Sequence, residues 1–217
     1  MISRFSTAAL PLLAASLLAG RAAAAPTTTK SARQDAGGER LVFAHYMVGI
    51  TDGQTAEKWA ADVAEAQAAG IDGFALNAGG QDTYNDVQLP LAYAAAEGAP
   101  GGQPFRAFIS FDQAASTWSV DQIVARVTQF ADSPAQFKID GRPVVSTFEG
   151  PDWADNWASV RDQTGGVHLI PDWSSLGPQG VGQRLDIIDG ACKWSLSVET
   201  FTHLPLSRGL LGSRLTL

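Results

Sequence analysis

The chain is poor in cysteine and in basic residues. Its 217 residues include one cysteine, Cys192, which excludes an intrachain disulfide and a four-thiolate zinc site. Acidic residues outnumber basic ones by 22 to 15, for a formal net charge of −7, and no Lys/Arg run offers a track for phosphates. With 45% hydrophobic residues, the composition predicts a globular protein that does not bind nucleic acid.

Short motifs of cofactor and metal chemistry are also missing. The sequence contains no G-x-G-x-x-G, no G-x-x-x-x-G-K-[ST] and no G-x-S-x-G, which disfavours dinucleotide binding, P-loop chemistry and an α/β-hydrolase. The three histidines, His45, His168 and His203, form neither H-x-H nor H-E-x-x-H. We therefore expect no metal and no cofactor.

The first 24 residues have the pattern of a secretory signal peptide. Arg4 supplies the positive start, residues 5–20 are mostly apolar, and Ala22 and Ala24 fit the A-x-A rule for cleavage after Ala24. A membrane anchor is disfavoured because the apolar run is shorter than the ~20 residues that span a bilayer. We expect a secreted, extracellular protein without a membrane partner once the leader is removed, and a flexible linker over residues 25–40.

From residue 41 onward, apolar runs alternate with helical patterns. Near-continuous apolar runs are typical of strands buried on both faces. Thr55 is an expected N-cap and Gly70 an expected helix end. The pattern predicts strands over 41–49, 71–79, 105–112, 143–150, 167–173 and 185–194, with helices over 55–69, 84–97, 119–132 and 152–164.

Strictly alternating units predict an α/β fold with parallel strands. A doubly wound open sheet and a TIM-type (β/α)8 barrel both fit. The polar or aromatic residues and loops that end the strands favour the barrel, here incomplete with about six β/α units over residues 41–194.

Polar and aromatic side chains follow the predicted strands. Carboxylates and amides bind sugar hydroxyls, aromatic rings stack on sugar rings, and a carboxylate pair serves glycoside hydrolysis. Each residue also has a structural alternative: Asp112 and Asp172 would cap turns, and His45 would be a core histidine. We read Trp153 as packing. The candidate substrate-binding residues are His45, Tyr46, Asn77, Asp112, Glu149, Asp172 and Trp173.

Five segments in order resemble fungal glycoside hydrolase family 71, the secreted endo-α-1,3-glucanases or mutanases. The resemblance implies a (β/α)8 barrel, hydrolysis of α-1,3-glucan in fungal cell walls or biofilms, and no metal. It also implies a role in the substrate cleft for five strand-end residues: His45, Asn77, Asp112, Glu149 and Asp172. The segments are LVFAHYMVG, AAGIDGFALNAG, FRAFISFD, GRPVVSTFEG and IPDWSSLGPQG.

One expected part of the family pattern is not in the sequence. The family's catalytic acids lie in a segment resembling W-N-D-Y-G-E, which this chain does not contain, so the catalytic residues are unknown and Glu149, Asp172 and Asp112 are weak candidates. Residues 195–217 match neither the family nor a β/α rhythm. We interpret them as an aberrant or non-homologous tail, with a short natural helix and loop as the alternative.

These residues and segments leave two functions open. The first is a glycoside hydrolase acting on α-1,3-glucan by carboxylate acid/base chemistry, without its catalytic pair in this chain unless Asp112, Glu149 or Asp172 has taken over that role. The second is a non-catalytic carbohydrate-binding protein or an inactive truncated relic.

Overall fold

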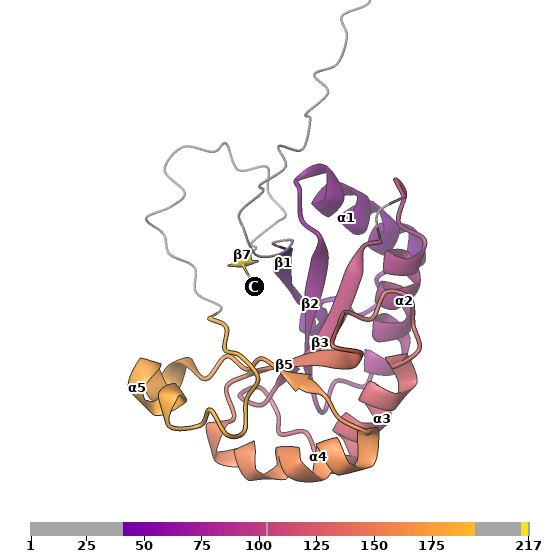
Figure 1. The fold of residues 1–217 in the computed structure, drawn as a ribbon. Helices are drawn as coiled ribbons and strands as arrows, with labels where there is room; N and C mark the ends of the chain where they lie inside the picture. Colours follow the sequence, from indigo (N-terminus) through magenta and orange to yellow (C-terminus); the bar gives the residue numbers. More distant parts are fainter. Residues whose placement is uncertain (1–40, 103, 194–213, 217) are drawn as a thin grey trace, which may run out of the picture. The chain divides into compact units, whose positions relative to one another are not determined.

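The computed structural model describes residues 41–102, 104–193 and 214–216 (Figure 1). The predicted leader, the linker and most of the predicted tail lie outside these residues. The elements, in chain order, are β1 (Val42–Met47), η1 (Val48–Ile50), α1 (Ala56–Ala68), β2 (Gly73–Gly79), α2 (Asn85–Glu97), β3 (Arg106–Asp112), α3 (Val120–Phe130), β4 (Lys138–Ile139), β5 (Arg142–Phe148), η2 (Pro151–Asn156), α4 (Trp157–Thr164), β6 (His168–Leu169), η3 (Ser174–Leu176), α5 (Gly177–Gly182) and β7 (Arg214–Thr216).

The centre of the fold is a parallel sheet with the strand order β1-β2-β3-β5-β6. Helices α1 to α4 separate these strands along the chain, as Figure 1 shows. The predicted α/β class, with alternating β/α units, is therefore confirmed. Two short strands run antiparallel to their neighbours: β4 pairs with β5, and β7 pairs with β1.

Alternation along the strands divides the core into two clusters. One cluster joins strand residues such as Ala44, Leu76 and Ile109 to helix residues such as Trp59 and Ile123, and we call this face of the sheet the helix side. The other cluster contains the strand residues that point to the opposite face of the sheet, and we call this face the inner side. It consists of Phe43, Ala75, Phe108, Phe137, Val144 and Ile170. Successive side chains of a strand point to opposite faces, so β1, β2, β3 and β5 each contribute to both clusters.

The helices begin and end at local signals. The Thr55 hydroxyl accepts a hydrogen bond from Lys58 N at 3.3 Å, which confirms the predicted N-cap of α1, and Gly70 follows that helix with φ +77°. Ser119 and Gln122 form a reciprocal capping box at the start of α3. Helix α2 continues through Pro90. The fourth helix, predicted over 152–164, begins with the 3-10 turns of η2 and becomes α-helical at Trp157.

The sixth predicted strand, over 185–194, is not a strand within the described residues 185–193. Residues up to 187 form turns, and only the following stretch lies beside β6, where Asp189 N donates to Leu169 O at 2.9 Å and Cys192 N to Pro171 O at 3.0 Å. Ile188 packs on the helix side and Cys192 against the inner cluster, whereas a regular strand would put residues four apart on the same face. With a further bond from Gly190 N to Leu169 O at 3.3 Å, the segment lies beside β6 but forms no regular ladder.

None of the described helices is both long and apolar enough to cross a membrane.

Candidate functional site

The carboxyl ends of the parallel strands gather polar side chains on the inner side. Asn77 lies beside Ser110 in the register of β2 and β3, and Asp112 lies beside Phe148, which itself bridges to Asp172. Asn77, Asp112 and Asp172 are all buried. Three of the seven predicted substrate-binding residues thus lie at one end of the sheet, which we call the carboxyl rim, and His45 lies beside Ala75, one inner-facing position before Asn77.

His45 connects β1 electrostatically to the two aspartates of the carboxyl rim. Burial lowers the pKa of His45 below its ordinary value, while the negative charges of Asp112 and Asp172 oppose that shift. The net direction is downward, so the imidazole is neutral at pH 7. Both carboxylates are thus close enough to act on the His45 ring electrostatically.

Asp112 and Asp172 each hold the loop that follows their strand. Oδ1 of Asp112 accepts hydrogen bonds from Ala114 N at 3.0 Å and Ala115 N at 2.7 Å. Oδ1 of Asp172 accepts from Ser174 N at 3.1 Å and from the Ser174 hydroxyl. These are Asx-type turns, the structural alternative that the sequence left open for both residues.

Glu149 binds the loop after the neighbouring strand. Its carboxylate accepts hydrogen bonds from Ser175 N at 3.0 Å and from the Ser175 hydroxyl at 2.5 Å, and its own N–H donates to Asp172 O at 2.7 Å. The residue has φ +57°, a left-handed conformation that non-glycine residues rarely adopt. Ser175 is thus a partner for the half-buried carboxylate.

Tyr46 and Trp173 do not belong to the carboxyl rim, contrary to the prediction. Tyr46 packs on the helix side with its ring 4.7 Å from that of Trp59, and its hydroxyl donates to Asp62 at 2.7 Å. Burial and the Asp62 hydrogen bond raise its pKa. Trp173 is buried in the helix-side cluster. Each directly follows a residue that faces the inner side, so the alternation of a strand sends it to the opposite face.

A hollow of about 450 Å³ opens between the loops that follow β3, β5 and β6. Trp153, half-buried, lines it and is held edge-on against Trp157 at 5.5 Å between ring centroids. A side chain at Gly150, which has φ +87°, would meet Gln113 Cβ at 2.6 Å, so glycine is required at that wall. The lining residues are Gln113, Thr117, Gly150, Pro151, Asp152, Trp153 and Ser175.

Trp153 is a candidate site residue that was not predicted from the sequence. The signal was present: Trp153 follows the end of strand β5 by a few residues, in the kind of strand-to-helix loop that forms the site of a β/α barrel. Its helical spacing favours packing, which is why the sequence alone does not assign it to the site.

Two buried polar groups under the carboxyl rim have no hydrogen-bond partner within the described part of the chain. They are Asn77 Nδ2 and Ser110 Oγ, which are neighbours in the strand register on the inner side. Buried polar groups are normally satisfied by protein or water, so this layer has hydrogen-bonding capacity to spare. Among residues 41–102 and 104–193, no group of three His, Cys, Asp or Glu side chains is arranged to hold a metal ion.

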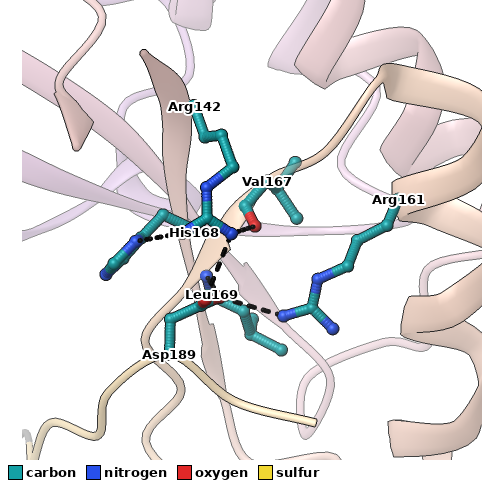
Figure 2. Close-up of polar contacts among 6 residues, drawn as sticks. All are labelled: Arg142, Arg161, Val167, His168, Leu169 and Asp189. Carbon is teal, nitrogen blue, oxygen red and sulfur yellow. Dashed lines mark hydrogen bonds and ion pairs between the residues drawn. The ribbon is translucent and has the colours of Figure 1, made fainter. Parts of the chain in front are cut away.

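A second polar cluster lies at the amino ends of β5 and β6 (Figure 2). Asp189 accepts hydrogen bonds from Arg142 at 3.1 Å, Arg161 at 3.0 Å and Leu169 N at 2.9 Å. The Arg142 guanidinium also contacts Val167 O and His168 Nδ1. Through this cluster the segment after α5 is bound to β5, β6 and α4. The cluster lies at the amino ends of the strands, the end of a β/α barrel whose residues contribute to stability rather than to the active site.

The sequence of this region matches a known protein family. The family model for glycosyl hydrolase family 71 matches residues 38–196. The chain belongs to this family. The five segments identified in the sequence, the alternating β/α units and the polar carboxyl rim all lie within the matched residues.

Curated relatives of this family 71 chain include two enzymes of fungi. A mutanase of Penicillium rubens is 38% identical over 158 residues, which cover 72% of this chain and 34% of the mutanase. A glucan endo-1,3-alpha-glucosidase of Schizosaccharomyces pombe is 36% identical over 169 residues, covering 72% of this chain and 39% of that enzyme. The chain therefore spans about a third to two fifths of the length of these relatives.

Among solved structures, a GH99 endo-alpha-mannosidase from Bacteroides thetaiotaomicron is similar in fold. The TM-score is 0.53 at 13% sequence identity, over 70% of this chain and 58% of the mannosidase. At this identity the likeness concerns the fold alone, and it agrees with a β/α barrel-type arrangement for the family 71 chain.

Proposed function

We propose that this chain binds α-1,3-glucan at its carboxyl rim and does not itself cleave the polysaccharide. The observation that carries the proposal is the hollow beside Trp153, whose lining residues Gln113 and Gly150 directly follow Asp112 and Glu149 in the chain. An aromatic face next to carboxylate, amide and hydroxyl groups suits a sugar ring, which offers apolar C–H faces and hydroxyl edges.

The choice of an α-1,3-linked glucan as the ligand rests on the family to which the chain belongs. The family 71 model covers the residues of the carboxyl rim, and relatives named mutanase and glucan endo-1,3-alpha-glucosidase are 38% and 36% identical over 72% of this chain. Fold likeness alone would not give a substrate, so the proposal combines these names with the site. No metal or cofactor enters it.

The hydrogen bonds of three carboxylates support binding without cleavage. Asp112, Asp172 and Glu149 each use carboxylate oxygens to hold a neighbouring loop in place. A general acid must carry a proton that it can give up, and a base needs a lone pair directed at water or substrate. These three carboxylates instead act as structural acceptors for the loops beside them.

Co-sedimentation with insoluble α-1,3-glucan tests the proposal. We expect the wild-type protein to sediment with α-1,3-glucan in preference to β-1,3-glucan and α-1,4-glucan, without releasing reducing ends. Trp153→Ala should weaken binding roughly tenfold, which is typical for loss of a central tryptophan. Val87→Ala, on an exposed position of α2, is the matched control and should bind as the wild type does. Equal binding by Trp153→Ala would contradict the assigned site.

Hydrolysis by the residues of the carboxyl rim is the second candidate function. It is supported by one observation, the joint electrostatic influence of Asp112 and Asp172 on His45. Release of reducing ends by the wild type, lost in both Asp112→Asn and Asp172→Asn, would replace the binding proposal with this one.

We further propose that binding takes place outside the cell, after removal of residues 1–24. The support is the pattern of Arg4, the apolar run and Ala22 and Ala24 in the sequence.

A further inference from the structure

Two neighbouring strand ends hold one loop from both sides. Glu149 binds Ser175 through backbone and hydroxyl, while Asp172 binds Ser174, the residue before it. The two strand ends are themselves joined, because Glu149 N donates to Asp172 O at 2.7 Å. The result is a closed ring of hydrogen bonds through Glu149, Asp172, Ser174 and Ser175, which we call the loop clamp.

The loop clamp shapes the hollow beside Trp153. Ser175 is the lining residue contributed by the loop after β6, and the others come from the loops after β3 and β5. Ser175 and Trp153 line the same hollow, so the position of Ser175 affects the shape of that hollow. Glucan chains of different linkage bend differently between successive rings, so a hollow of fixed shape admits one bend better than another.

Glu149 holds its place in this ring in an unfavourable conformation. Its φ of +57° is normally occupied by glycine or asparagine, and an outlier of this kind at a candidate site motivates a functional hypothesis. Glycine would remove the strain but has no carboxylate, and asparagine would tolerate the conformation but is one methylene shorter. Glutamate combines the negative charge with the reach to Ser175.

We propose that Glu149 is a positioning residue that sets the linkage selectivity of the hollow by holding Ser175 in place. The inference rests on the proposed function, because selectivity requires that the hollow bind glucan. Glu149 acts through the loop, and Ser175 faces the sugar.

The test is calorimetric titration of the intact chain with an α-1,3-linked and an α-1,4-linked tetraglucoside. We expect the wild type to prefer the α-1,3 linkage. Glu149→Asn, too short to reach Ser175, should lower α-1,3 affinity roughly tenfold and bring the two affinities together. Glu149→Gln keeps the length and one acceptor oxygen for Ser175 N, so its selectivity should lie between the wild type and Glu149→Asn.

Asp140→Asn is the matched control. Asp140 is the other non-glycine residue with positive φ in the described part of the chain, at 51°, and it lies in the turn between β4 and β5. Its substitution should leave selectivity unchanged. Ser175→Ala removes the hydroxyl alone and should move selectivity in the same direction as Glu149→Asn, which keeps the test valid if the latter does not fold.

The outcomes separate the two proposals. Unchanged selectivity in Glu149→Asn and Ser175→Ala, with a wild type that binds, would overturn the positioning role and leave glucan binding intact. Equal losses for both sugars together with a lowered unfolding temperature would also overturn it, since that is the signature of a merely structural residue. A wild type that binds neither sugar would overturn the proposed function itself.

Discussion

Asp189 joins three parts of the fold through one carboxylate. Arg142 reaches it from β5, Arg161 from α4, and the backbone of Leu169 from β6 (Figure 2). Burial on its own raises the Asp189 pKa, but the hydrogen bonds from Leu169, Arg161 and Arg142 outweigh it, and the net pKa lies below the ordinary value. The folded protein therefore favours the ionised form.

This shift gives a prediction for stability against pH. A lowered folded pKa contributes stability above the unfolded pKa, near 3.8, which is lost as the pH falls through the folded value. Asp189→Asn should cost about 1 kcal/mol of unfolding free energy at pH 7, a modest figure because the side chain is 21% exposed and solvent screens it. Urea unfolding at pH 7 and pH 3 would measure it, and the difference from the wild type should shrink at pH 3.

Asp132→Asn, on an exposed residue beyond α3, is the control for Asp189→Asn and should show little effect at either pH. A difference between Asp189→Asn and the wild type that is the same at both pH values would contradict the role of the charge.

Single residues also show what a sequence can reveal about a site. Asn77, Asp112 and Asp172 were predicted at strand ends and lie buried at the carboxyl rim, because parallel strands bring their carboxyl ends to one edge. Tyr46 and Trp173 were misplaced although strand alternation already assigns them to the other face. The partners of Glu149 and Asp172 depend on where a loop folds back, which spacing does not determine.

At the scale of elements, local signals predicted helices better than strands. The predicted N-cap Thr55 is one such signal, and the structure shows another at α3, the capping box of Ser119 and Gln122, which was not predicted. A helix terminus is set by residues near in sequence, which satisfy its free N–H groups. The segment over 185–193 has strand-like composition but forms turns before it reaches β6, because a strand needs a ladder on a neighbour as well as a suitable composition.

The capping box of α3 gives the second stability prediction. Ser119→Ala leaves the Gln122 N–H without its side-chain acceptor and should cost about 1 kcal/mol of unfolding free energy. Ser119→Asp, which retains an acceptor at the N-cap, should recover most of the loss. Urea denaturation measures both variants, and wild-type stability in Ser119→Ala would show that α3 is fixed by packing alone.

At the scale of the whole molecule, the alternating pattern predicted the fold class and five sequence segments predicted the family. The fold class could be predicted from the sequence because strands buried on two faces give long apolar runs. The family could be predicted because the strand-end segments keep their order along the chain. The hollow was not accessible, since it is formed by three loops that are distant in sequence and by Gly150, whose requirement for glycine is visible only against Gln113.

The N-terminus gives a prediction for the complete chain. If residues 1–24 direct secretion, expression in a secreting fungal host should yield extracellular protein that begins at Ala25, as determined by mass spectrometry of the intact protein. Arg21 and the alanines that follow it define the cleavage region, so Ala24→Leu should reduce cleavage at this site. Intracellular protein that retains Met1 would contradict the proposal.

The most direct test of glucan binding is amide hydrogen–deuterium exchange of the intact chain with and without an α-1,3-linked tetraglucoside. Binding at the carboxyl rim predicts slower exchange in the loops that line the hollow, at residues 113–117, 150–153 and 174–176, with no change around Arg142 and Asp189 at the opposite strand ends. Exchange that is unchanged in these loops at saturating sugar, or slowed only elsewhere, would contradict the assignment of the carboxyl rim as the glucan site.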